Sequence, residues 1–145
     1  MAADLPALDA AATRIGDRWT LLVVGTLLDG AARFGELQEA IPGVAPNILT
    51  KRLRTLEQEG LVVAEPYSRR PVRLAYRLTG QGAALADALR MLAQWGAEQP
   101  DAGPATERSV PLQHRACGTP VEAKWWCPTC GVDVDDDDAS DLRWV

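Results

Sequence analysis

The sequence has no apolar run that could cross a membrane. Its uninterrupted apolar segments are short, as in Leu21–Val24, whereas a membrane helix needs about 20 consecutive apolar residues. The first residues, MAADLPALDAA, also lack the basic start and apolar stretch of a signal peptide. We therefore expect a cytoplasmic protein that does not act on a membrane.

Histidine and cysteine are scarce, with one histidine and three cysteines in 145 residues. The sole histidine, His114, belongs to a metal-ligand pattern described below. Little then remains from which an acid–base active site could be built, and we expect no enzymatic activity. An odd number of cysteines in a reducing compartment also disfavours a disulfide.

Basic residues are outnumbered, and the net charge of −5 at first argues against a nucleic-acid partner. The acidic residues are unevenly distributed, however. Residues 14–96 carry 11 Lys and Arg against 8 Asp and Glu, whereas residues 97–145 carry 4 against 10. The middle of the chain is therefore weakly basic, and the acidic balance belongs mainly to the C-terminal part.

Residues 34–60 have the pattern of two helices separated by a break. Apolar residues recur at helical spacing in residues 34–41, and Pro42-Gly43 interrupts that helix. A second helix is expected to begin at Pro46 and to end just before Gly60. Two helices joined by a tight turn form a helix-turn-helix.

The second of these helices has an apolar stripe and an opposite polar, basic face. Its residue types suit a DNA major groove, where Arg and Lys favour guanine edges and Asn and Gln favour adenine. The alternative is an ordinary amphipathic hairpin with a solvated face. On the first interpretation, the DNA-binding residues of this helix are Asn47, Thr50, Lys51, Arg52, Arg54 and Gln58.

A β-hairpin with a basic tip is predicted directly after this helix. Two runs rich in β-formers flank the turn at residues 68–71, and in the second run apolar residues alternate with Arg73 and Arg77. A recognition helix followed by a basic hairpin is typical of a winged helix. We predict further DNA contacts from Arg69, Arg70 and Arg73.

Thr79 is expected to cap a long alanine-rich helix that follows the hairpin. Leu85, Leu89 and Leu92 lie along one side of it, and the apolar surface exceeds what one neighbour can cover. This pattern favours a helix–helix interface between subunits. The alternative is packing on the first helix of the same chain.

Residues 8–97 closely resemble the HxlR-type transcriptional regulators, which are winged helix-turn-helix proteins related to the MarR group. The resemblance implies a homodimer, paired through its terminal helices, on a palindromic operator. The matching features include Gly16 through Trp19, Leu28-Asp29-Gly30, Phe34, Glu36-Leu37, Ile41-Pro42-Gly43, Leu49, Arg52-Leu53, Leu56-Glu57, Gly60-Leu61-Val62, Tyr76 and Leu78-Thr79.

Two departures from the family pattern concern sensing and helix capping. Many relatives carry a cysteine before the first helix, which in some senses oxidants or electrophiles, but residues 1–30 here contain none. That mechanism cannot be transferred to this chain. Ala45 stands where the family often has a serine, so the side-chain cap of the recognition helix is missing.

Two copies of one half-motif occur in residues 111–134. Each copy places two ligand residues three positions apart and ends in Cys-Gly, the spacing of a zinc knuckle. Four protein ligands leave no open position for water, so the metal is expected to be structural. We predict one zinc ion per chain, bound by His114, Cys117, Cys127 and Cys130.

The sequence therefore predicts an α+β protein with four parts. A winged helix-turn-helix domain with an N-terminal arm and dimerising terminal helices spans residues 1–98, followed by a linker (99–110), a zinc-ribbon-like module (111–134) and an acidic tail (135–145). The predicted function is transcriptional regulation as a homodimer on double-stranded operator DNA. Two alternatives stay open: a zinc- or redox-responsive sensor, and a protein-interaction module without DNA binding. No small-molecule effector can be named from the sequence.

Overall fold

The computed structural model describes residues 4–99 and 112–134. These residues belong to two compact units, one of residues 9–90 and one of the described residues on either side. The predicted acidic tail and nearly all of the predicted linker lie outside the described residues. Within those ranges, no helix is long and apolar enough to span a bilayer.

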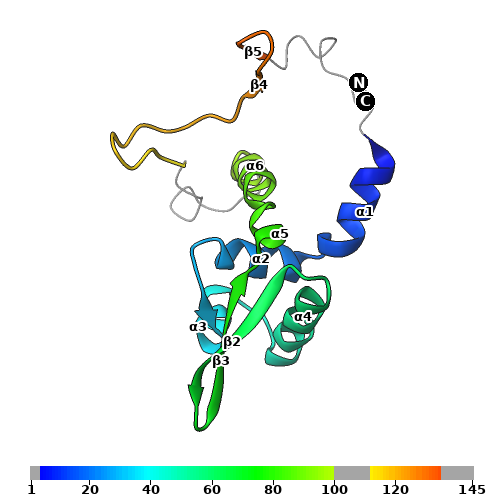
Figure 1. The fold of residues 1–145 in the computed structure, drawn as a ribbon, viewed down its shortest axis with the longest axis vertical. Coiled ribbons are helices and arrows are strands. Elements are labelled where there is room, and N and C mark those ends of the chain that lie inside the picture. Colours follow the sequence, from blue (N-terminus) through cyan, green and yellow to red (C-terminus); the bar gives the residue numbers. More distant parts are fainter. Residues whose placement is uncertain (1–3, 100–111, 135–145) are drawn as a thin grey trace. The chain divides into compact units, whose positions relative to one another are not determined.

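Residues 9–90 form the predicted winged helix-turn-helix (Figure 1). Strands β1, β3 and β2 make an antiparallel three-stranded sheet in that order. The helices and strands along the chain are α1 (Leu5–Ile15), α2 (Arg18–Leu27), β1 (Ala32–Arg33), α3 (Phe34–Ala40), α4 (Pro46–Gln58), β2 (Val62–Arg69), β3 (Val72–Leu78), α5 (Gly80–Ala83) and α6 (Ala86–Ala97).

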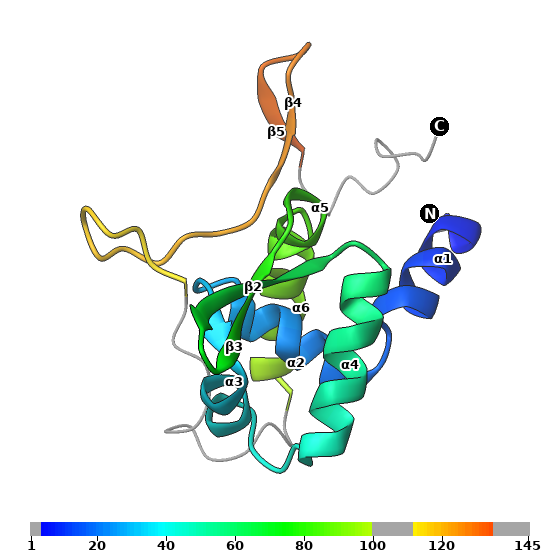
Figure 2. The same ribbon diagram turned by 60° about the horizontal axis from the view of Figure 1, so that its bottom comes forward.

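The core of this unit lies where α2, α3 and α4 meet the sheet. Leu49, Leu53 and Leu56 of α4 are fully buried there, and α4 packs against both α2 and β2 (Figure 2). Trp19 is half-buried against this cluster. The buried apolar side chains are Val23, Val24, Leu27, Leu37, Ile41, Val44, Leu49, Leu53, Leu56, Leu61 and Val62.

Helix α2 begins at a side-chain cap. The Asp17 carboxylate accepts hydrogen bonds from Trp19 N at 3.0 Å and Thr20 N at 3.2 Å. A carboxylate here satisfies free amides and faces the positive end of the helix dipole. Asp17 is therefore the N-cap of α2.

The predicted single helix after Thr79 is wrong in one respect, because two helices follow. Thr79 does cap the first, accepting a hydrogen bond from Gly82 N at 3.1 Å, but α5 ends at Ala83 and α6 begins at Ala86. Gly82 packs so closely that a Cβ there would lie 2.1 Å from Leu61 O. This contact ties α5 to the start of the wing.

The second described unit includes a small two-stranded sheet in residues 112–134. Strand β4 (Trp125–Cys127) pairs antiparallel with β5 (Val132–Val134). No residue of this segment is fully buried, and Trp125 and Trp126 are 56% and 59% exposed. The segment therefore has secondary structure without an apolar core of its own.

Candidate nucleic-acid interface

Helix α4 has the two faces that the sequence predicts. Pro46 occupies its first turn, and the Ala45 position makes no side-chain cap bond. Leu49, Leu53 and Leu56 are at most 1% exposed and anchor the helix in the core. The opposite face therefore points toward solvent.

This outer face of α4 is a shallow open hollow lined by polar and basic side chains. The side chains lining it are Asn47, Thr50, Lys51, Arg54, Thr55 and Gln58. Five of these six are predicted DNA-binding residues. Thr55 is the one that the sequence analysis missed, although it stands four positions after Lys51, one helical turn further along the same face.

The two threonines of this face use their hydroxyl protons within the helix. Thr50 Oγ1 donates to Pro46 O at 2.8 Å, and Thr55 Oγ1 donates to Lys51 O at 3.1 Å. Their oxygens and methyl groups remain available, which suits acceptance from an amino group or contact with a thymine methyl. Donation to a base edge is thereby left to Lys51, Arg54 and the side-chain amides.

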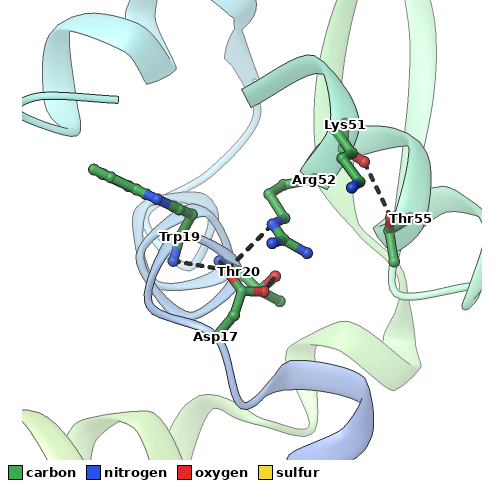
Figure 3. Close-up of polar contacts among 6 residues, drawn as sticks. All are labelled: Asp17, Trp19, Thr20, Lys51, Arg52 and Thr55. Carbon is green, nitrogen blue, oxygen red and sulfur yellow. Dashed lines mark hydrogen bonds and ion pairs between the residues drawn. The ribbon is translucent and has the colours of Figure 1, made fainter. Parts of the chain in front are cut away.

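Arg52 lies apart from this face (Figure 3). Its guanidinium approaches the start of α2, with Nε 3.2 Å from Asp17 Oδ1, and the side chain is only 28% exposed. Arg52 is predicted from the sequence as a DNA-binding residue because it belongs to the basic cluster around Lys51. A step of one residue turns a helix by about 100°, so adjacency in sequence does not place two side chains on one face.

The wing extends from the unit past α3 (Figure 1). Strands β2 and β3 pair from Val62–Leu78 at the base to Arg69–Val72 at the tip, with an irregularity between Pro66 and Ser68. Proline is tolerated because β2 is an edge strand, paired only with β3.

The wing carries its positive charge at the tip. Arg69, Arg70 and Arg73 are all exposed. Within residues 4–99 and 112–134 none of the three forms a salt bridge, and the same is true of Lys51 and Arg54. These five cations are therefore free to meet phosphates or base edges without first breaking an internal pair.

Nearer the base, the wing is braced by internal contacts. Arg77 donates to Glu65 from Nε at 2.9 Å and from Nη2 at 2.6 Å. This hydrogen bonding holds the pKa of Glu65 below its ordinary value. Arg33, next to α3, lies over the Tyr67 ring at 4.4 Å. Charged groups along the wing thus differ in role. Those nearer the base form internal contacts, whereas the arginines at the tip form no salt bridge within the described residues.

The candidate metal ligands lie in two turns of the same form. In the first turn, Gly118 N donates to His114 O at 2.8 Å, and in the second Gly131 N donates to Cys127 O at 2.9 Å. Both glycines have positive φ, 71° and 69°, which only glycine adopts readily. The repeated half-motif in the sequence is therefore a repeated turn in the structure.

The structure brings these ligands together in pairs only. His114 Nδ1 lies 3.4 Å from Cys117 Sγ, and hydrogen bonds from the Cys130 backbone and thiol lower the pKa of Cys127. In the described ranges, no three His, Cys, Asp or Glu side chains converge as a metal site would require. Each pair fits one half of a tetrahedral ligand set, but the two halves do not meet.

A helix-turn-helix with a free basic outer face, followed by a wing with a free basic tip, defines a winged-helix protein of the DNA-binding type. Comparison with known families identifies which one. Residues 14–103 match the family model described as the HxlR-like helix-turn-helix, and the chain belongs to this family. The match ends before the segment that carries the cysteines.

Individual relatives agree with this assignment. The chain is 37% identical over 123 residues to Rv3095, an uncharacterised HTH-type transcriptional regulator of Mycobacterium tuberculosis, covering 83% of this chain and 74% of the relative. A solved MarR-family regulator from Enterococcus faecalis has a TM-score of 0.58 at 38% identity, over 66% of this chain and 87% of that one.

A third relative extends further along the chain. The solved structure of PA1607, a candidate transcription factor, has a TM-score of 0.73 at 36% identity, over 92% of this chain and 89% of that one. The protein is thus a transcriptional regulator of the HxlR and MarR type. The prediction of the family and of the winged fold is confirmed.

Proposed function

We propose that this regulator binds a palindromic operator as a homodimer, with α4 of each subunit in the major groove. The observation that supports this most directly is the outer face of α4. It carries Lys51 and Arg54 without internal ion-pair partners in the described residues, among amides and hydroxyls. Such a face offers both base readout and phosphate attraction.

The wing supplies the second contact in this proposal. Arg69, Arg70 and Arg73 gather at a hairpin tip that extends from the same unit as α4. Arginines at such a tip suit the phosphate backbone, which carries no direct sequence information. The wing is therefore expected to add affinity on all sequences, whereas α4 supplies the discrimination among them.

The proposed dimer would use the terminal helices. Leu85 and Leu89, which the sequence analysis assigned to a subunit interface, are half-buried against the core of the same chain. Leu92 and Trp95 of α6, in contrast, are 52% and 63% exposed. We therefore assign the interface to this exposed part of α6 and to the exposed leucines of α1, Leu5 and Leu8, which carry apolar area that a partner subunit would cover.

A structural zinc ion in residues 112–134 remains part of the proposal. Its support is the pair of identical turns, each holding two ligand residues, in a segment without buried side chains. A metal bridging the two turns would supply the cross-link that an apolar core supplies elsewhere. A regulatory role for this zinc, through oxidation of the thiols, is the alternative that the same residues allow.

The experiment for the proposed function is selection of bound duplexes from random DNA with the full-length protein. We expect an enriched sequence with two-fold symmetry, and affinity that falls steeply with salt. Sedimentation of the same sample should show a dimer at micromolar concentration. Absence of any enriched sequence would favour the alternative of a protein-interaction module that has kept the fold without DNA binding.

A further inference from the structure

The start of α2 and the middle of α4 are joined by a polar contact at the edge of the core (Figure 3). Arg52 Nε lies 3.2 Å from Asp17 Oδ1, and the two side chains are 28% and 34% exposed. The Thr20 hydroxyl, which is buried, donates to the other carboxylate oxygen of Asp17. One carboxylate therefore caps α2 and holds a cation of α4 at the same time.

This contact is electrostatically demanding. The start of α2 is the positive end of a helix dipole, where a guanidinium alone would be repelled. Asp17 lies at that start and offsets the repulsion. Arg52 Nε is itself buried and, in the described residues, has no aligned hydrogen bond. The attraction to Asp17 is then what compensates the loss of its hydration.

The direction in which the Arg52 side chain points matters because Arg52 adjoins Lys51 on α4. Figure 3 shows its side chain pointing toward Asp17 and Thr20, away from Lys51 and Thr55. The buried leucines of α4 are apolar and non-directional, so they fix its depth in the core more tightly than its rotation about its own axis. A charged contact at one flank would add a directional constraint on that rotation.

We propose that Asp17 and Arg52 are positioning residues for DNA reading, which set the rotation of α4 and hence the direction of Lys51, Arg54 and Thr55. This inference rests on the proposed function and adds residues that do not touch DNA. Arg52 is accordingly an internal partner of Asp17 rather than a phosphate ligand.

The two roles open to Arg52 predict opposite effects of removing Asp17. If Arg52 binds phosphate, removal of Asp17 deletes a nearby negative charge and frees a cation, so DNA binding should tighten. If Arg52 positions α4, removal of Asp17 lets the helix rotate and strands a buried cation, so operator binding should weaken.

The experiment uses Asp17→Ser, because serine also caps a helix start but carries no charge. Binding of the full chain to its selected operator and to random duplex is measured over a range of salt. We expect operator affinity to fall about tenfold, in the range of coupling between contacting residues. The salt dependence should be unchanged, and the ratio of operator to random affinity should fall.

Arg52→Ala should give the same result, and the double variant should bind no more weakly than the weaker single one, because both changes remove one contact. Arg52→Lys, which keeps the charge without the fork geometry, should recover part of the discrimination. Lys124→Ala is the charge-matched control, since Lys124 pairs with Asp133 outside the winged helix, and its operator affinity should equal that of the unmodified chain.

Thermal unfolding identifies any variant that fails to fold, and Arg52→Lys then carries the test in place of Arg52→Ala. Tighter binding by Asp17→Ser, or a shallower salt dependence in Arg52→Ala, would assign Arg52 to phosphate and overturn the inference. Unaltered discrimination in folded Asp17→Ser and Arg52→Lys would overturn it as well. If the unmodified chain selects no DNA, the proposed function fails together with this inference. If the unmodified chain selects an operator and only the variants give a contradicting result, the inference is wrong and the proposed function is unaffected.

Discussion

Different interactions stabilise the backbone in residues 9–90 and in residues 112–134. The first unit buries a continuous cluster of leucines, valines and isoleucine beneath three helices and a sheet. The second segment exposes its two tryptophans, and its turns are defined by backbone hydrogen bonds and two glycines with positive φ. A periodic apolar pattern is enough to specify the first. The second has the local turns without an apolar core, and the proposed zinc ion is what would hold them together.

Removal of the metal should produce the largest difference between the two regions, in the rate at which their backbone amides exchange hydrogen. Structural zinc in small fingers is bound with an apparent free energy of about 10–16 kcal/mol, which is also folding free energy. A chelator should therefore speed amide hydrogen exchange at Gly118 and Gly131, whose N–H groups close the two turns. The amides of α2 and α4 should exchange as slowly as before.

Cys127→Ser should reproduce this loss of protection without a chelator, while Ser68→Ala in the wing serves as a matched surface control. The zinc proposal would be contradicted by reduced, purified protein that contains no zinc and protects both turns equally with and without chelator.

The next largest difference between the two regions is expected in the free energy of unfolding that is lost when a large side chain is replaced by alanine. Leu53 is 1% exposed, and Leu53→Ala is expected to lower the free energy of unfolding of the winged helix by about 2–5 kcal/mol. Trp126→Ala, despite removing a larger side chain, should change it by less than about 0.5 kcal/mol because Trp126 is mostly exposed. Urea denaturation followed by circular dichroism measures both, and equal losses would refute the distinction between the regions.

Within the winged helix, the outer face of α4 should contribute specificity. Arg54→Ala is expected to cost about 1–3 kcal/mol of operator binding and to relax the preference at one base position. Repeating the selection from random DNA with this variant would locate that position. An unchanged preference in a folded variant would exclude the proposed orientation of α4.

The wing tip should contribute affinity without specificity, which is the smallest of these effects on the preferred sequence. Replacement of both Arg69 and Arg70 by Ala should make the dependence of log affinity on log salt shallower by about two phosphates per subunit. The base preference should stay as it is. A salt dependence equal to that of the unmodified chain would mean that the tip does not reach DNA.

The sequence was sufficient for the parts of the molecule that local chemistry controls. Pro46 and Gly60 predict the two ends of α4. The outer face of α4 follows from the spacing of its leucines. Five of its six lining residues could therefore be named in advance.

The remaining features depend on contacts between distant parts of the chain. Arg52 adjoins Lys51 in sequence, but its partner Asp17 caps the start of α2, and no local pattern indicates that pairing. The alanine-rich pattern likewise did not indicate the break between α5 and α6. The half-motifs around Cys117 and Cys130 predict two turns correctly, whereas their convergence on one ion stays a prediction.

Whether residues 112–134 take part in DNA binding can be tested most directly by titrating the full-length protein with its selected operator, over a range of salt, before and after chelation. If the winged helix alone binds DNA, the operator affinity and its salt dependence should be the same in both series. The backbone amides of residues 112–134 should nevertheless exchange hydrogen faster after chelation. Loss of operator binding after chelation, with the unfolding transition of the winged helix intact, would contradict this account. The cysteine segment would then be part of the DNA-binding or sensing mechanism.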